Sequence, residues 1–219
     1  LDTLKDRIRR SGFPVVENYR KPEALAERVK EDLWKLIDEA YPASEVPDAL
    51  AQERMRHEAF ASSRLGLYIG GEEYLRALDA AVSAEPRQPV LVCGASGGGK
   101  SALLANWARA RSLAHPGAIV LTHFLATGSD AAHPVSMTIR LLREISRITG
   151  EELVLEGDPR KALRMLGEWL EKAGNFARER GGVFVLVLDS LDKMTEHHDL
   201  DWWPRRLPDG VALVASRSE

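Results

Sequence analysis

The stretch Gly94-Ala95-Ser96-Gly97-Gly98-Gly99-Lys100-Ser101 matches the phosphate-binding loop pattern G-x-x-x-x-G-K-[ST] at every position. It follows the apolar run 89–93 and precedes a helical pattern that begins at Ala102. Strand, glycine-rich loop and helix are the context that this pattern needs, because backbone N–H groups and the helix N-terminus then point at one anion. The sequence therefore predicts that residues 94–102 bind nucleotide phosphates. The alternative is a flexible glycine-rich turn.

Three side chains complete the predicted site. Lys100 is expected to contact the β- and γ-phosphates, and the Ser101 hydroxyl is expected to ligate magnesium. The apolar run 185–188 ends in Asp189, whose carboxylate is expected to hold the metal through water at the end of a parallel strand. The alternative for Asp189 is a residue that caps a turn. These residues therefore predict a nucleotide cofactor with Mg²⁺, and they do not separate ATP or ADP from a guanine nucleotide.

Hydrolysis would need a further group that orients the attacking water. Many enzymes of this broad type carry Glu directly after the metal-binding Asp, but this chain has Ser190 there. The next acid, Asp192, is either that group or a solvated residue at a helix start. Arg217 ends the last apolar run and would sense the γ-phosphate if its strand lay between the other core strands; otherwise it is a surface arginine. The candidate catalytic residues are Lys100, Asp189, Asp192 and Arg217.

The hydrophobic pattern predicts an α/β fold. Apolar runs at 90–93, 118–125, 183–189 and 211–217 indicate strands, and the amphipathic stretches 134–148 and 159–180 between them indicate helices. This alternation is typical of a doubly wound, mostly parallel sheet, here an incomplete P-loop NTPase core over residues 89–219.

Two further segments precede the predicted core. Residues 50–88 are expected to form linker helices and an entry element that leads into the core, and residues 1–49 are expected to be the tail of a preceding α/β domain. In this small N-terminal α/β segment, helical patterns at 1–10 and 22–40 flank a short predicted strand at 13–19. The chain does not begin with Met and is interpreted as a fragment of something longer.

Composition and charge limit the kinds of partner that the chain is expected to bind. The 219 residues carry a net charge of −3, which gives no electrostatic reason for nucleic-acid binding, and no apolar stretch approaches the ~18 residues of a membrane helix. The single cysteine, Cys93, fits a reducing cytoplasm. Cys93 is expected to be a small buried residue, with a reactive thiol as the alternative.

Residues 64–219 together resemble the NACHT-type branch of the signal-transduction ATPases with numerous domains, closest to the group of nephrocystin-3 and the telomerase-associated proteins. The resemblance rests on Leu67-Tyr68-Ile69-Gly70-Gly71-Glu72-Glu73-Tyr74-Leu75, on 93–107, on 120–124, on Leu188-Asp189-Ser190-Leu191-Asp192 and on 207–217. It departs from the family at Gly71 and Lys193. The first 60 residues resemble, more weakly, the end of a domain of unknown function.

The resemblance implies a switch that binds ATP or dATP, hydrolyses it slowly and controls self-association in the full-length protein. It places Tyr68 and Ile69 near the adenine. Two alternatives stay open: a conventional ATPase or kinase of the same fold, and a nucleotide-binding scaffold without turnover.

Three smaller features of the sequence also carry expectations. The run Glu196-His197-His198-Asp199 is interpreted as a solvated loop rather than a metal site. Trp202 and Trp203 are expected to pack over the edge of the sheet, with a partner interface as the alternative. His123 is expected to be a core histidine, although its strand end could reach the phosphates.

Overall fold

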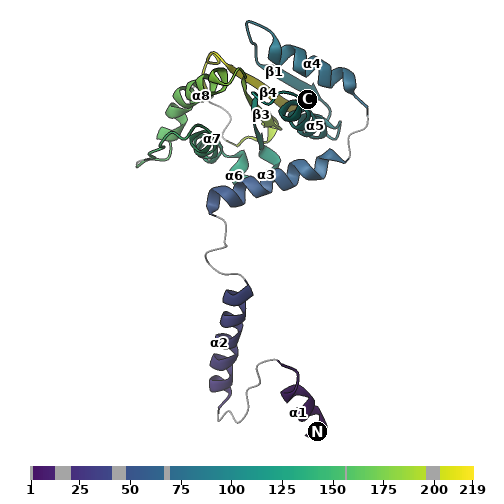
Figure 1. The fold of residues 1–219 in the computed structure, drawn as a ribbon, viewed down its shortest axis with the longest axis vertical. Coiled ribbons are helices and arrows are strands. Elements are labelled where there is room, and N and C mark those ends of the chain that lie inside the picture. Colours follow the sequence, from purple (N-terminus) through teal and green to yellow (C-terminus); the bar gives the residue numbers. More distant parts are fainter. Residues whose placement is uncertain (1, 13–20, 41–47, 67–69, 156, 196–202) are drawn as a thin grey trace. The chain divides into compact units, whose positions relative to one another are not determined.

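The computed structural model describes residues 2–12, 21–40, 48–66, 70–155, 157–195 and 203–219 (Figure 1). The chain divides into two units, Leu1–Asp48 and Ala49–Glu219. The first unit contains helices α1 (Asp2–Arg9) and α2 (Pro22–Ala40), and no residue of α2 is buried. The strand predicted at 13–19 lies outside the described residues.

The second unit is built on a four-stranded parallel sheet. Its strands are β1 (Val90–Gly94), β2 (Ile119–Phe124), β3 (Phe184–Asp189) and β4 (Val211–Ser218), in the order β1-β4-β3-β2. The sequence placed all four strands within two residues of their observed bounds. Because β4 lies between β1 and β3, the carboxyl ends of these three strands meet at one edge of the sheet.

Helices cover both faces of this sheet (Figure 1). Helices α4 (Glu72–Ser83) and α5 (Lys100–Ala114) pack on one face of the sheet. The residues that they contact there are Val183, just before β3, Val185 and Val187 in β3, and Ala212 and Val214 in β4. Helices α7 (Pro134–Thr149) and α8 (Lys161–Glu179) pack on the other face of the sheet. The residues on that face are 184, 186 and 188 of β3 and 211, 213 and 215 of β4. The predicted mixed α/β architecture with a parallel sheet is confirmed.

The edge strand β1 corrects one prediction. Central β3 is buried along its whole length, as its continuous apolar run indicates, but burial alternates along β1. Leu91 is 50% exposed and Cys93 is also exposed, because only every second residue of β1 packs against the α4–α5 side. The expectation that Cys93 is buried is wrong, since an edge strand has a neighbour on one side only.

The opposite edge strand, β2, is covered by α3 (Ala49–Leu65). Three short helices complete the unit: η2 (Leu125–Thr127), α6 (Ser129–Ala132) and η3 (Leu191–Lys193). None of the helices in the described part of the chain has the length and apolar character that crossing a membrane requires.

Histidines attach α3 to β2. The Phe124 N–H donates to His57 Nδ1 at 3.1 Å, and the His57 ring lies 4.5 Å from the ring of His123. His123 is fully buried, as expected for a core histidine, and its Nε2 donates to the carbonyl of Ala131 at 2.8 Å. Its Nδ1 is therefore left to accept from Arg140 Nη1 at 3.1 Å. These bonds join α3, β2 and α7 in one buried polar cluster.

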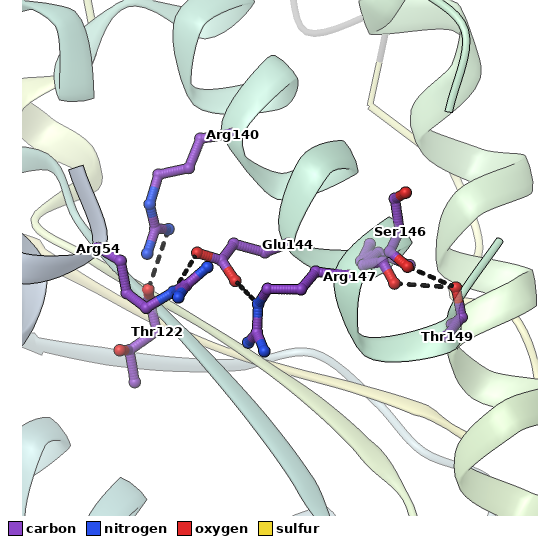
Figure 2. Close-up of polar contacts among 8 residues, drawn as sticks. Arg54, Thr122, Arg140, Glu144, Ser146, Arg147 and Thr149 are labelled. Atoms are coloured by element: carbon purple, nitrogen blue, oxygen red, sulfur yellow. Dashed lines mark hydrogen bonds and ion pairs between the residues drawn. The ribbon is translucent and has the colours of Figure 1, made fainter. Parts of the chain in front are cut away.

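The same cluster contains a buried carboxylate, Glu144 (Figure 2). Its two oxygens accept from Arg54 Nε at 2.9 Å and from Arg147 Nε at 3.1 Å. Arg140, one helical turn away, is 3% exposed and donates to the carbonyl of Thr122 at 3.2 Å. Burial lowers the pKa of Arg140, and the charge of Glu144 opposes that shift. The cluster is thus rich in cations and holds its carboxylate between two guanidinium groups.

Candidate phosphate and metal site

The glycine-rich loop turns sharply between β1, which ends at Gly94, and α5, which begins at Lys100. Gly97 and Gly99 have φ angles of 80° and 82°, in the left-handed region that residues with a Cβ rarely adopt. Residues 95–99 are exposed. The loop therefore presents its backbone to solvent directly in front of a 15-residue helix.

Lys100 folds back over this loop. Its Nζ donates to the carbonyls of Gly94 at 2.7 Å and Ala95 at 2.8 Å. Both acceptors are neutral, so the ammonium charge stays available at the mouth of the loop. A phosphate bound at the loop would meet this charge together with the N-terminal end of α5.

Asp189, at the end of β3, lies beside the first turn of α5. Its carboxylate is fully buried and is held by hydroxyl groups. Oδ2 accepts from Ser101 Oγ at 2.7 Å and from Ser190 Oγ at 3.2 Å, and Oδ1 accepts from Ser216 Oγ at 2.6 Å. Within the described part of the chain, no lysine, arginine or histidine pairs with Asp189. Among the described residues, the hydrogen-bond partners of this carboxylate are therefore hydroxyl groups and not cations.

Sequence reasoning singled out Arg217 at the end of β4, but the side chain that reaches Asp189 belongs to Ser216. Successive side chains of a strand point to opposite faces, so Ser216 shares the α5 face with Val214 and Asp189. Arg217 is exposed, continues the row of Leu213 on the other face, and is in register with Cys93 of β1. The two-residue period along β4 is the signal that could have pointed to Ser216.

The remaining candidates bind the end of β4, lie in the first turn of α5 or fall outside the described residues. Asp192 Oδ1 accepts from the Ser218 N–H at 2.8 Å, so this carboxylate binds the end of β4. Ala102 is buried in the first turn of α5. Tyr68 and Ile69 lie outside the described residues, as do Glu196-His197-His198-Asp199 and Trp202. Trp203 is half-buried against the α7–α8 side of the core.

The donor set fits magnesium better than a metal held by protein alone. No group of three or more His, Cys, Asp or Glu side chains that could hold a metal occurs among the described residues. Mg²⁺ usually keeps several waters and takes one or two protein oxygens together with phosphate oxygens. Ser101 donates its proton to Asp189, which leaves the hydroxyl lone pairs for a cation. The pair therefore suits a metal that arrives with a phosphate.

The chain was compared with known proteins. No family model matches it. A TPR repeat-containing protein of Dictyostelium discoideum is 24% identical over 99% of this chain and 17% of its own length. Nephrocystin-3 of mouse and of human are 31% and 32% identical, each over 84% of this chain and 13% of the relative. The chain spans less than a fifth of the length of these curated relatives.

The comparisons correct the predicted family and function. The resemblance predicted a NACHT-type P-loop ATPase that hydrolyses ATP slowly and whose nucleotide state controls self-association. The alternatives were a conventional ATPase or kinase and a nucleotide-binding scaffold without turnover. The relatives are instead named for TPR repeats or as nephrocystin-3, and none of these names describes an ATPase. The physical reason is that an eight-residue loop specifies contacts to phosphate, whereas turnover and assembly depend on groups elsewhere.

Proposed function

We propose that this chain is part of a protein-interaction scaffold and that its loop at 94–101 binds nucleotide phosphate together with Mg²⁺. The scaffold role is supported by the TPR relatives, because stacked helical repeats form extended binding surfaces. The phosphate and metal role is supported by one observation above all. A fully buried carboxylate, Asp189, lies beside the loop with hydroxyl donors as its partners.

Burying an ionised carboxylate without a cation is costly, so a cation that binds there is strongly favoured. Magnesium carried by a phosphate would supply the missing charge through Ser101 and Asp189. Lys100 would leave the loop carbonyls for the β- and γ-phosphates. The N–H groups of residues 94–102 would surround the same phosphates. ATP or ADP is the proposed ligand.

Other predictions about this ligand and its setting stay untested. Tyr68 and Ile69 remain predicted base contacts, and Asp192 and Arg217 remain predicted to act near the γ-phosphate. Self-association and a cytoplasmic location are likewise predictions.

A thermal-shift experiment tests the binding half of the proposal. The chain is melted with ATP, ADP and GTP, each with Mg²⁺, beside Lys100→Ala and the matched control Lys161→Ala, which removes an exposed lysine at the start of α8. A ligand at about 100 times its dissociation constant should stabilise the chain by about 2.7 kcal/mol. We expect a shift in the parental chain and the control, and none in Lys100→Ala. The proposal is wrong if no nucleotide shifts the melt, or if Lys100→Ala shifts equally.

A phosphate-release assay tests whether the chain hydrolyses the nucleotide that it binds. A scaffold that binds nucleotide without using its hydrolysis should release phosphate no faster than Lys100→Ala does under the same conditions. Sustained release by the parental chain alone would contradict this role.

A further inference from the structure

We infer that Ser216 is a positioning residue that orients the Asp189 carboxylate toward magnesium, so that Mg²⁺-dependent nucleotide binding depends on β4. The inference rests on the proposed function and goes beyond it. Neither the loop pattern nor the strand that ends in Asp189 includes this serine, which lies 27 residues farther along the chain.

The Ser216 hydroxyl makes two hydrogen bonds. It is buried, donates its one proton to Asp189 Oδ1 at 2.6 Å, and accepts from the Ser190 N–H at 2.8 Å. A hydroxyl has one proton to give, so the direction of the bond to Asp189 is determined. Ser216 therefore cannot turn its proton away from the carboxylate without losing this bond.

The two carboxylate oxygens of Asp189 consequently differ in their neighbours. Oδ1 is held on the β4 side by Ser216, and Oδ2 points toward Ser101 at the start of α5. Rotation of the carboxylate would break one of these two short bonds. Oδ2 is thus kept on the side where Ser101 and the loop would present a metal and a phosphate.

The backbone of Ser190, the residue after Asp189, is bonded to the same Ser216 hydroxyl. The φ angle of Ser190 is 65°, and Ser190 is the one residue other than glycine with a positive φ among the residues that the structure describes. Such a backbone costs free energy and persists where the surroundings hold it. Here its N–H is held by Ser216 and its hydroxyl by Asp189. Loss of the Ser216 hydroxyl would remove the bond to Asp189 Oδ1 and the bond that holds the Ser190 N–H.

Nucleotide titrations with Mg²⁺ and with EDTA test the inference, using the parental chain, Ser216→Ala and Ser216→Thr. The ratio of the two dissociation constants measures how far the metal contributes. Removing a group that orients a metal ligand typically costs about 10-fold to 100-fold in metal affinity. We expect Ser216→Ala to lose at least about tenfold of the Mg²⁺-dependent gain while its affinity in EDTA changes by less than about twofold. Ser216→Thr keeps a hydroxyl and should retain the gain.

The outcomes separate this inference from the proposed function. A parental chain that binds no nucleotide in either buffer overturns the proposed function and this inference with it. If the parental chain gains affinity with Mg²⁺ and Ser216→Ala gains equally, the inference alone is wrong. A merely structural serine would alter the melting temperature and leave the ratio unchanged. If Ser216→Ala does not fold, the nearly isosteric pair Ser216→Thr and Ser216→Val makes the same comparison.

Discussion

Glu144 and Asp189 are two buried carboxylates in the same unit, and their surroundings are opposite. Glu144, 2% exposed, lies between the guanidinium groups of Arg54 and Arg147. Asp189, fully buried, accepts hydrogen bonds from the hydroxyls of Ser101, Ser190 and Ser216. One negative charge is balanced by protein cations and the other is held by neutral donors.

The two sets of partners suggest different roles: the charge of Glu144 stabilises the fold, and the carboxylate of Asp189 is suited to binding a cation. A buried ion pair that loses one partner leaves an uncompensated charge, so the cations around Glu144 hold α3 and α7 together. A carboxylate that is oriented but not neutralised instead attracts an external cation. Variants and pH should therefore affect the Glu144 cluster through stability and the Asp189 site through ligand binding.

Acidification should have the largest effect, and it acts on the Glu144 side. The pKa of His57 is lowered to about 2 by burial and then by the charges of Arg140, His123 and Arg56. The pKa of His123 is lowered to about 3, again by burial first and then by Arg140. The unfolded chain takes up protons below pH 6.5, whereas the folded chain does not. Stability is therefore complete above pH 6.5 and is lost as the pH falls toward these values.

Between pH 7 and pH 5 the two histidines together should lower the free energy of unfolding by on the order of 3–4 kcal/mol. Urea unfolding at the two pH values measures this loss. His57→Asn places an amide oxygen near the Nδ1 position, so it keeps an acceptor for the Phe124 N–H and should remove about half of the pH dependence. Equal stability at both pH values would show that burial of these two histidines does not lower their pKa values as expected.

Glu144→Gln should have the next largest effect. Removing the charge leaves Arg54 and Arg147 facing a neutral amide beside buried Arg140, so the free energy of unfolding should fall by about 3 kcal/mol. Denaturant unfolding measures it, with Glu151→Gln as the control, because Glu151 is 55% exposed in its pair with Lys172. Nucleotide affinity should stay unchanged. A loss below about 1 kcal/mol would mean that the cluster is not held by this charge.

Asp189→Asn should show the opposite pattern. An amide can replace the carboxylate among hydroxyls that are able to donate or accept, so the free energy of unfolding should change by less than about 1 kcal/mol. Mg²⁺-dependent nucleotide binding should weaken by about tenfold or more, which corresponds to about 1.4 kcal/mol. Calorimetric titration and denaturant unfolding of the same sample measure both quantities. Severe destabilisation with unchanged binding would reverse the roles assigned to the two carboxylates.

Arg147→Ala should have the smallest effect. Arg147 is 53% exposed and pairs with Glu144 within one helix, while Arg54 keeps its own bond to the same carboxylate. The expected loss of unfolding free energy is below about 1 kcal/mol. Arg54→Ala, which breaks the bond between α3 and α7, should cost more. The order of these two variants in urea unfolding is the check, and equal losses would show that exposure does not separate the two pairs.

Local pattern explains what could be read in advance. The apolar runs located the four strands, and the glycine-rich loop indicated how β1 leads into α5. The same patterns overestimated the burial of Cys93, since an apolar run does not say whether its strand lies at an edge. The prediction of an ATPase switch came instead from the family resemblance over residues 64–219, and it is wrong because a shared fold and loop do not carry the activity of a whole protein.

Contacts between residues far apart in the chain could not be predicted from the sequence. His57 binds the Phe124 N–H from 67 residues away, and Arg54 binds Glu144 from 90 residues away. The hydrophobic pattern of one segment does not indicate which distant segment it will contact. Ser216 is an intermediate case, because its face on β4 follows from the two-residue period once the strand is known.

The sequence by itself determined the strands, most of the helices and the loop whose backbone suits phosphate, because these depend on residues close together in the chain. Tertiary structure decided that β4 lies between β1 and β3, and so which serine reaches Asp189. It also decided which buried carboxylate lies between guanidinium groups and which is held by hydroxyl groups. Charge balance in a core depends on which distant segments meet, and this is why the two carboxylates could not be told apart before folding.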